Sequence, residues 1–78
     1  MPRYFFHIYD EVFVRDDEGM ELTDDDAARR AAMAGIREMV CEQVKKGRLV
    51  LHHRLEVEDA AGAPVMSLAY GDAVAVEP

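Results

Sequence analysis

The side chains best suited to metal binding or acid–base chemistry are three histidines and one cysteine, His7, His52, His53 and Cys41. Adjacent residues of a strand point to opposite faces of its sheet, so His52 and His53 do not readily bind one metal ion together. The set also lacks the Cys-x-x-Cys spacing of a zinc site. We therefore predict no metal site, and we expect His53 to lie at the edge of the core.

The sequence gives little support for a catalytic nucleophile or for a site built from carboxylates. Cys41 would need a neighbouring histidine to act as a nucleophile, and no sequence signature supplies one. The acidic residues 16–18 lack the spacing of an EF-hand, and together with Gly19, which can adopt a positive φ, they indicate a turn. No P-loop, dinucleotide-binding glycine motif or serine-hydrolase motif is present. The sequence predicts no catalytic residue, no cofactor and no enzymatic activity.

The formal net charge of −7 is unevenly distributed along the chain. Residues 29–54 are rich in bases, whereas the segments on either side are acidic. The basic-patch candidates are Arg29, Arg30, Arg37, Lys45, Lys46, Arg48 and Arg54. An acidic protein is not expected to bind nucleic acid tightly, because such binding depends on neutralising phosphates. Binding of RNA or another polyanion through residues 29–54 is therefore an alternative function.

Length and composition indicate one small domain, residues 1–78. The single cysteine excludes a disulfide within the chain. The apolar run near the N-terminus is too short for a signal peptide, and no stretch approaches the ~20 apolar residues of a membrane span, so we expect a cytoplasmic protein. A core this small leaves stability marginal, which favours self-association.

The alternation of side chains along the chain and the residue types predict the strands that position these residues. Residues 3–9 are aromatic and β-branched and predict a strand that is apolar on both faces. The other predicted strands are 12–14 and 20–22, both short, then 49–58 and 64–70. Residues 73–76 are either a last short strand or a helical turn capped by Asp72.

A single long helix is predicted for residues 24–46. Thr23 is the expected N-cap with Asp26 three residues later, and Gly47 is the expected C-terminal cap. The order is β(ββ)-α-β-β. Because strands adjacent in sequence usually pair, we expect an α+β fold in which a small, mainly antiparallel sheet of three or four strands carries the helix on one face.

The predicted helix has more apolar surface than one sheet face requires. Ala28, Ala32, Gly35, Ile36 and Met39 form one stripe. Met33, Val40 and Val44 form a second stripe. This second stripe indicates either a deeply seated helix or contact with a second subunit. The interface candidates are Met33, Val40, Val44 and Phe5.

Several segments resemble a family of short bacterial proteins. They are the opening PRYFFHI at residues 2–8, DEGMEL at 17–22, DAAR at 26–29, and the closing Val57-x-Asp59 with Gly62 and Ala73-Val74. On these residues nearly the whole chain resembles the uncharacterised domain of unknown function 6894, of the rhizobial type. The resemblance implies a small cytoplasmic bacterial protein, and it transfers neither an activity nor functional residues.

A weaker resemblance, at the level of fold, is to HicB-type antitoxin domains. In these domains too, an aromatic strand, a turn and a further strand precede an alanine-rich helix. This chain lacks their proline-glycine-cysteine segment and an appended DNA-binding domain. Since fold does not determine function, this resemblance predicts no activity.

Three functional hypotheses follow. The first is a non-enzymatic protein-interaction or regulatory module that self-associates, in its simplest form as a homodimer. The second is binding of RNA or another polyanion through residues 29–54. The third is a small enzyme or ligand-binding protein that uses His7, His53 and either Tyr4 or Tyr70, which would require a cleft that brings these side chains together.

Overall fold

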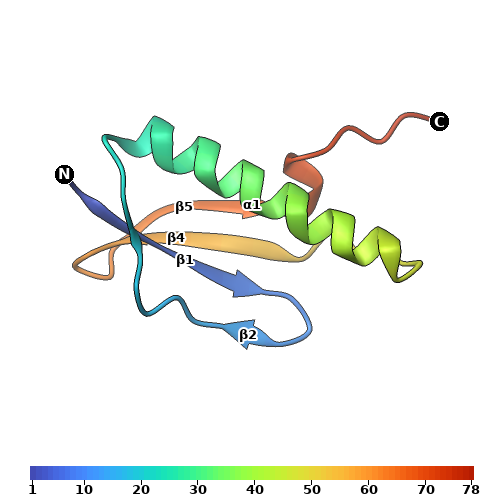
Figure 1. Cartoon of the computed structure of the whole chain (residues 1–78), viewed down its shortest axis with the longest axis horizontal. Coiled ribbons are helices and arrows are strands. Elements are labelled where there is room, and N and C mark those ends of the chain that lie inside the picture. Colours follow the sequence, from blue (N-terminus) through green and yellow to red (C-terminus); the bar gives the residue numbers. More distant parts are fainter.

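A five-stranded antiparallel sheet carries one long helix in the computed structural model, which describes residues 1–78 (Figure 1). The strands are β1 (Arg3–Tyr9), β2 (Phe13–Val14), β3 (Met20–Glu21), β4 (Arg54–Asp59) and β5 (Pro64–Ala69). The sheet order is β2-β1-β4-β5, and β3 also pairs with β1. The predicted α+β class and element order are confirmed, and the sheet has five strands because both two-residue strands join β1.

β1 pairs with three other strands of the sheet, β2, β3 and β4. It has the predicted bounds and pairs with β4 from Tyr4 opposite Asp59 to Tyr9 opposite Arg54. On its other side it pairs with β2 at one end and with β3 at the other. The middle of this second side has no strand partner, and the loop between β2 and β3 lies there.

The helix α1 (Asp25–Lys45) begins one residue later than predicted. Asp24, not Thr23, is the N-cap, because its backbone is extended and its carboxylate accepts the N–H of Ala27 at 2.8 Å. The prediction of Thr23 was therefore wrong by one residue. No helix of the chain combines the length and the hydrophobicity that crossing a membrane requires.

The C-terminal end of α1 confirms Gly47 as its cap. Gly47 has φ +81°, and its N–H donates to the carbonyl of Val44 at 2.9 Å. The N–H of Arg48 donates to the carbonyl of Gln43 at 3.0 Å. These two bonds form a Schellman motif, which satisfies carbonyl groups that have no partner within the helix.

The predicted strand at residues 49–58 is wrong in its first half, since β4 begins only at Arg54. Both of its neighbours end there, because Arg54 pairs with the last residue of β1 and with the last residue of β5. Residues 49–53 form a loop fixed by other contacts. The side-chain Oε1 of Gln43 accepts the N–H of Val50 at 3.0 Å, and the carbonyl of Leu51 accepts the N–H of Gly71 at 2.9 Å.

The segment after β5 also differs from the prediction. Residues 73–76 form neither a strand nor a helical turn, and the helical turn comes earlier, as the 3₁₀ turn η1 (Tyr70–Asp72). Asp72 Oδ2 accepts the N–H of Ala69 at 2.8 Å, a donor at the edge of the sheet. Pro64, at the other end of β5, has no N–H. Both features protect the free edge of β5 from pairing with another strand.

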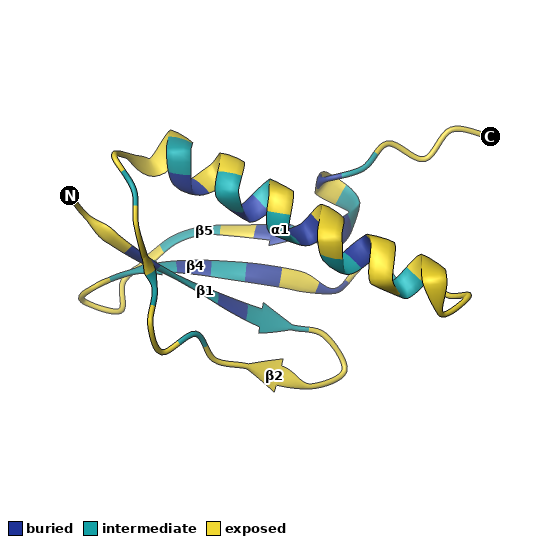
Figure 2. Cartoon of the chain, viewed as in Figure 1, coloured by how far each residue is buried: buried dark blue, intermediate teal, exposed yellow.

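The core lies between α1 and the sheet (Figure 2). It comprises Ala28, Ala32, Ile36 and Val40 from α1, Tyr4, Leu55, Val57 and Leu68 from the strands, and Tyr70 and Ala73 from the C-terminal segment. The small residues of α1 bring its axis close to the sheet. The predicted first stripe of the helix is thus confirmed as its buried face for Ala28, Ala32 and Ile36.

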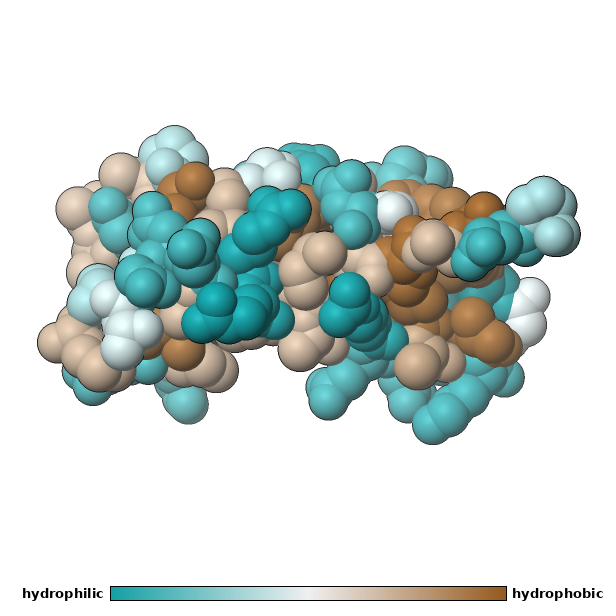
Figure 3. Space-filling view, turned by 90° about the horizontal axis from the view of Figure 1, so that it is seen from above, coloured by the Kyte–Doolittle hydropathy of each residue, from teal (hydrophilic) through white to brown (hydrophobic).

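The second predicted stripe of the helix is covered in part by the chain's own C-terminal segment. Arg37, on this flank of α1, donates through Nε to the carbonyl of Ala73 at 2.8 Å. Val40 is 8% exposed and belongs to the core of the single chain. Val44 is 58% exposed and Met33 is half-buried. Figure 3 shows hydrophobic side chains gathered on the right, over the C-terminal half of α1 and the C-terminal segment.

Candidate functional site

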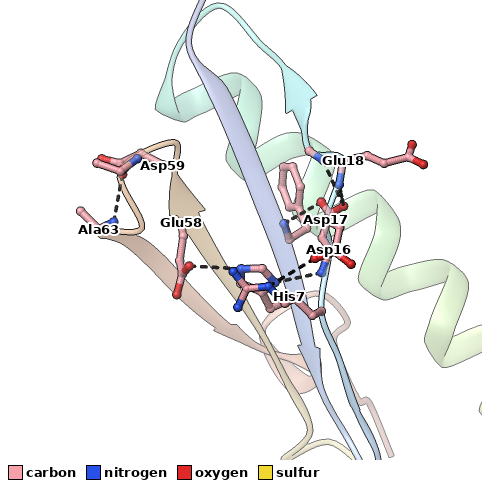
Figure 4. A network of polar contacts seen from close by, with 11 residues as sticks. His7, Asp16, Asp17, Glu18, Glu58, Asp59 and Ala63 are labelled. Atoms are coloured by element: carbon pink, nitrogen blue, oxygen red, sulfur yellow. Dashed lines mark hydrogen bonds and ion pairs between the residues drawn. The ribbon is translucent and has the colours of Figure 1, made fainter.

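His7 is a buried side chain on the sheet face opposite α1, and both of its ring nitrogens are occupied (Figure 4). Nδ1 accepts the backbone N–H of Asp16 at 3.0 Å, so this nitrogen carries no proton. Nε2 therefore carries the proton and donates to Glu58 Oε1 at 3.1 Å. With 2% exposure, the imidazole has no free nitrogen for a metal ion or a substrate, and it joins residue 16 to β4.

Asp16 fills the gap left between β2 and β3 along β1. Its Oδ2 accepts the N–H of Phe6 at 3.0 Å, and its Oδ1 accepts the N–H groups of Glu18 at 3.2 Å and Gly19 at 3.1 Å. Burial disfavours the charged carboxylate, but these backbone donors outweigh it, and the pKa of Asp16 is lowered below its usual range. The carboxylate thus replaces a missing strand partner for Phe6. We call residues 15–19, held to β1 in this way, the β1 clamp.

Tyr4 connects β1 to the start of α1. Its hydroxyl donates to Asp25 Oδ1 at 2.7 Å, and the ring is 3% exposed. The hydrogen bond to Asp25, followed by burial and by the nearby charges of Asp25, Asp24 and Asp59, raises the pKa of Tyr4 to about 12. Ionisation of the phenol would place two negative charges next to each other, so the bond exists only with a neutral tyrosine.

The effect of this hydrogen bond on the ionisation of Tyr4 can be measured. In an absorbance titration of phenolate, Tyr4 is expected to ionise near pH 12, and Asp25→Asn is expected to bring it back toward the ordinary value near 10. Because the pKa of Tyr4 is higher in the folded chain than in the unfolded chain, this hydrogen bond contributes its full folding stability below pH ~10. That contribution is lost as the pH rises toward about 12. Tyr70, whose pKa burial also raises, is the internal control, since its hydroxyl contacts Met39 Sδ and not Asp25. An unchanged titration in Asp25→Asn would contradict the assignment.

The adjacent histidines lie in the loop before β4. His53 is 9% exposed, as expected of a residue at the edge of the core. Its Nδ1 accepts the side-chain N–H of Gln43 at 3.1 Å, and its ring meets Tyr70 edge-on at 5.6 Å. His52 is exposed. No three histidine, cysteine or acidic side chains are grouped so as to hold a metal ion.

The basic-patch candidates do not form one surface. Lys45, Arg48 and Arg54 form ion pairs with acidic residues, and Arg37 donates to the carbonyl of Ala73. The guanidinium of Arg54 lies 4.3 Å from the ring centre of Tyr9, on the sheet face opposite α1. The candidates without an ion pair are Arg29, Arg30, Arg37 and Lys46. The structure therefore does not gather these bases into a binding face for a polyanion.

The interface candidates are dispersed over three places. Val40 lies in the core, and Met33 and Val44 lie on the helix flank beside the C-terminal segment. Phe5 is half-buried on the opposite face of the sheet, next to Gly19 of the β1 clamp. Phe5 therefore has a structural neighbour within its own chain.

An open groove runs between α1 and β1. The helix packs mainly on β4, β5 and η1, and on the helix-facing side of β1 it covers Tyr4 but leaves Phe6 and Ile8 only half-buried. The groove has a volume of about 760 Å³. Apolar residues dominate its walls: Phe6, Ile8, Met20, Ala31, Ala32, Met39, Cys41 and Leu55, with Gly35. Its charged residues are Asp16, Glu38, Glu42 and Lys45. This groove is the main concave surface that the chain offers to another molecule.

The comparison with protein families decides where the chain belongs. The model of the family described as "Domain of unknown function (DUF6894)" matches residues 3–71. The chain belongs to the DUF6894 family. No curated protein and no solved structure matches it. The resemblance inferred from the opening strand and from residues 17–22 is confirmed, whereas bacterial origin and the likeness to HicB-type antitoxins stay expectations.

The matched span of this DUF6894 chain contains the β1 clamp and all residues of the groove. The sequence analysis missed both features. Asp16 had a signal, because an aspartate commonly accepts backbone N–H groups of the residues that follow it in a turn. The groove had none, because it results from the lateral position of α1 on the sheet.

Proposed function

We propose that this DUF6894 protein is a cytoplasmic, non-enzymatic interaction or regulatory module that self-associates as a homodimer. The observation that supports it is the gathering of hydrophobic side chains over the C-terminal half of α1 and the C-terminal segment (Figure 3). We call this surface the helix-end patch; its members are Val44 and Val76, which are exposed, and Val74, which is half-buried.

Two members of this patch are largely exposed, and the core of the chain is small. Val44 is 58% exposed and Val76 is 66% exposed, while only 12 of 78 residues are buried. Each apolar side chain removed from water contributes about 25 cal/mol per Å². Covering the patch would therefore add stability that the small core cannot supply by itself.

A second copy of the chain is the simplest cover for the helix-end patch. The members of the patch are uncharged, and the neighbouring Arg37 donates through Nε to the carbonyl of Ala73. In a two-fold dimer the same surface contributes from both subunits, and apolar side chains meet apolar side chains. The protected edge of β5 makes pairing of sheets through β5 a less suitable route to a dimer.

Sedimentation analysis of the wild type and of Val44→Glu tests this proposal. The wild-type mass is expected to rise toward that of a dimer between about 5 and about 200 µM, the range of weak dimers. Val44→Glu would bury a carboxylate in the interface, and the dissociation constant is expected to rise at least about tenfold. The side chain is exposed in the single chain, so the thermal midpoint at low concentration should change little.

Val12→Glu is the matched control, because Val12 is 67% exposed and lies in the loop between β1 and β2, outside the patch. It makes the same chemical change and should leave the dimer intact. A wild type that stays monomeric over the whole range would refute self-association. A Val44→Glu variant that dimerises like the wild type would refute the patch.

A further inference from the structure

The groove beside β1 is a second surface, separate from the helix-end patch. Gly35 faces the groove, whereas Met33 and Val44 lie on the other flank of α1. Its walls follow α1 from Ala31 to Lys45, which corresponds to about 21 Å at 1.5 Å per residue. Its floor is apolar, and Val14, the cross-strand partner of Ile8, extends it with 49% exposure. An elongated apolar groove of this kind accepts a chain segment along its length.

The charges around the groove are mainly negative. Three carboxylates, those of Asp16, Glu38 and Glu42, face one ammonium group, that of Lys45. Lys45 is already paired with Glu42 at 3.2 Å. Glu38 is exposed and forms no ion pair within the chain. The groove is therefore complementary to a molecule that combines apolar side chains with positive charge.

Backbone hydrogen bonding favours a helix over a strand as the occupant. A strand would need free N–H and C=O groups along β1. That side of β1 is already paired with β2 and β3, and the N–H of Phe6 in between is bound by Asp16. A helix satisfies its own backbone and needs only side-chain contacts from the groove.

Gly35 allows a partner to approach α1 closely. A Cβ atom built at this position meets nothing within 4 Å, so no packing within the chain requires a glycine. Glycine is also an unfavourable residue in a helix interior. Together with Ala31, which also lines the groove, it leaves room for the side chains of a second helix against the backbone of α1.

From the apolar floor, the acidic walls and the paired edge of β1 we infer that the groove binds a cationic amphipathic helix of another protein. Its apolar stripe would lie on Phe6, Ile8 and Met20, and its lysines or arginines would face Glu38 and Glu42. The inference does not depend on self-association, because a Val44→Glu monomer keeps the whole groove.

Fluorescence anisotropy with three labelled peptides of about 14 residues tests the inference. The first carries leucines at i, i+3, i+4 and i+7 with lysines elsewhere, the second has the same composition in scrambled order, and the third has glutamates in place of the lysines. The first peptide is expected to bind at least about tenfold more tightly than the other two. Equal binding of the scrambled peptide would show unspecific attraction and would overturn the inference.

Two variants place the binding in the groove. Gly35→Phe places a bulky ring in the groove at a position where a Cβ atom meets nothing within 4 Å, and it is expected to weaken binding of the lysine peptide at least about tenfold. Glu38→Lys is expected to weaken the lysine peptide and to strengthen the glutamate peptide. Glu77→Lys, in the C-terminal segment, makes the same change in net charge and should have little effect. Thermal unfolding of each variant verifies that the fold is retained.

Other occupants give different results, and each would overturn the inference. If a second copy filled the groove, Gly35→Phe would reduce the sedimentation mass and no peptide would bind. If the groove held a small apolar amine, octylamine would bind in a Gly35-dependent manner and the peptides would not. Binding of the lysine peptide that Gly35→Phe leaves unchanged would place the site elsewhere.

Discussion

Gly19→Ala is expected to destabilise the fold by about 2–5 kcal/mol. Gly19 has φ +72°, a region that costs an L-residue about 1–2 kcal/mol. A Cβ atom there would also lie 2.8 Å from the carbonyl oxygen of Tyr4 and 3.0 Å from Phe5 Cε1. Because the first of these neighbours is backbone of β1, relief requires the β1 clamp to move away from the sheet.

Gly62→Ala is the control that has the backbone part of this effect without the steric part. Gly62 has φ +80° in the β4–β5 loop, but a Cβ atom there meets nothing within 4 Å. Only the cost of the left-handed backbone remains, about 1–2 kcal/mol. Urea unfolding of both variants gives the comparison. If Gly19→Ala lowers the free energy of unfolding by no more than Gly62→Ala does, the β1 clamp is not packed tightly against β1.

Asp16→Ala is expected to cost about 2–4 kcal/mol at neutral pH. It removes the acceptor for three backbone N–H groups, and those of Phe6 and Gly19 are partly buried. Asp16→Asn should cost about 1–2 kcal/mol, because it keeps one acceptor oxygen and turns an N–H₂ group toward a donor. Asp17→Asn is the matched control, since Asp17 makes only an exposed ion pair with Arg15 at 3.3 Å.

The contribution of Asp16 also has a defined pH dependence. The pKa of this carboxyl is lowered in the folded chain, whereas it is about 3.9 in the unfolded chain. The stabilisation is therefore complete above pH ~4 and is lost as the pH falls through the lower, folded pKa. The difference in unfolding free energy between wild type and Asp16→Asn should shrink on acidification. If the difference in unfolding free energy between wild type and Asp16→Asn does not change with pH, hydrogen bonding to the charged carboxylate is not the source of the stabilisation.

His7 contributes to the same clamp through its uncharged form. Its Nδ1 must be free of a proton to accept the N–H of Asp16, and Nε2 must carry one to reach Glu58. The imidazole thus joins β1, the clamp and β4 with a single side chain. An aromatic N-terminal strand that contains one histidine is consistent with this structural role.

Local features of the sequence predicted those parts of the fold that local physics controls. β1 has its predicted bounds because its aromatic and β-branched residues favour an extended strand. α1 ends at Lys45, two residues before Gly47, because glycine readily adopts the positive φ of a Schellman motif. The N-cap prediction differed by one residue, because Thr23 and Asp24 can both cap a helix and only the backbone angles decide between them.

The candidate site was predictable to a smaller extent. Asp16 and Gly19 were identified as a turn, but their contacts with Phe6 and His7 join residues about ten positions apart. The stripe of Met33, Val40 and Val44 was identified as apolar surface in excess of one sheet face, and the sequence left open whether the chain itself or a second subunit covers it. In the structure Val40 is buried, Met33 is half-buried and Val44 stays exposed.

By itself, the sequence determined the elements, their order and the apolar faces they must bury, because helix caps, alternation and helical periodicity act over a few residues. Only the tertiary structure decided that β4 starts at Arg54, since a strand extends only as far as its neighbours. It also decided that α1 lies over β4, β5 and η1 and leaves Phe6 and Ile8 in an open groove. That position depends on long-range packing of the C-terminal segment against α1, which no local pattern encodes.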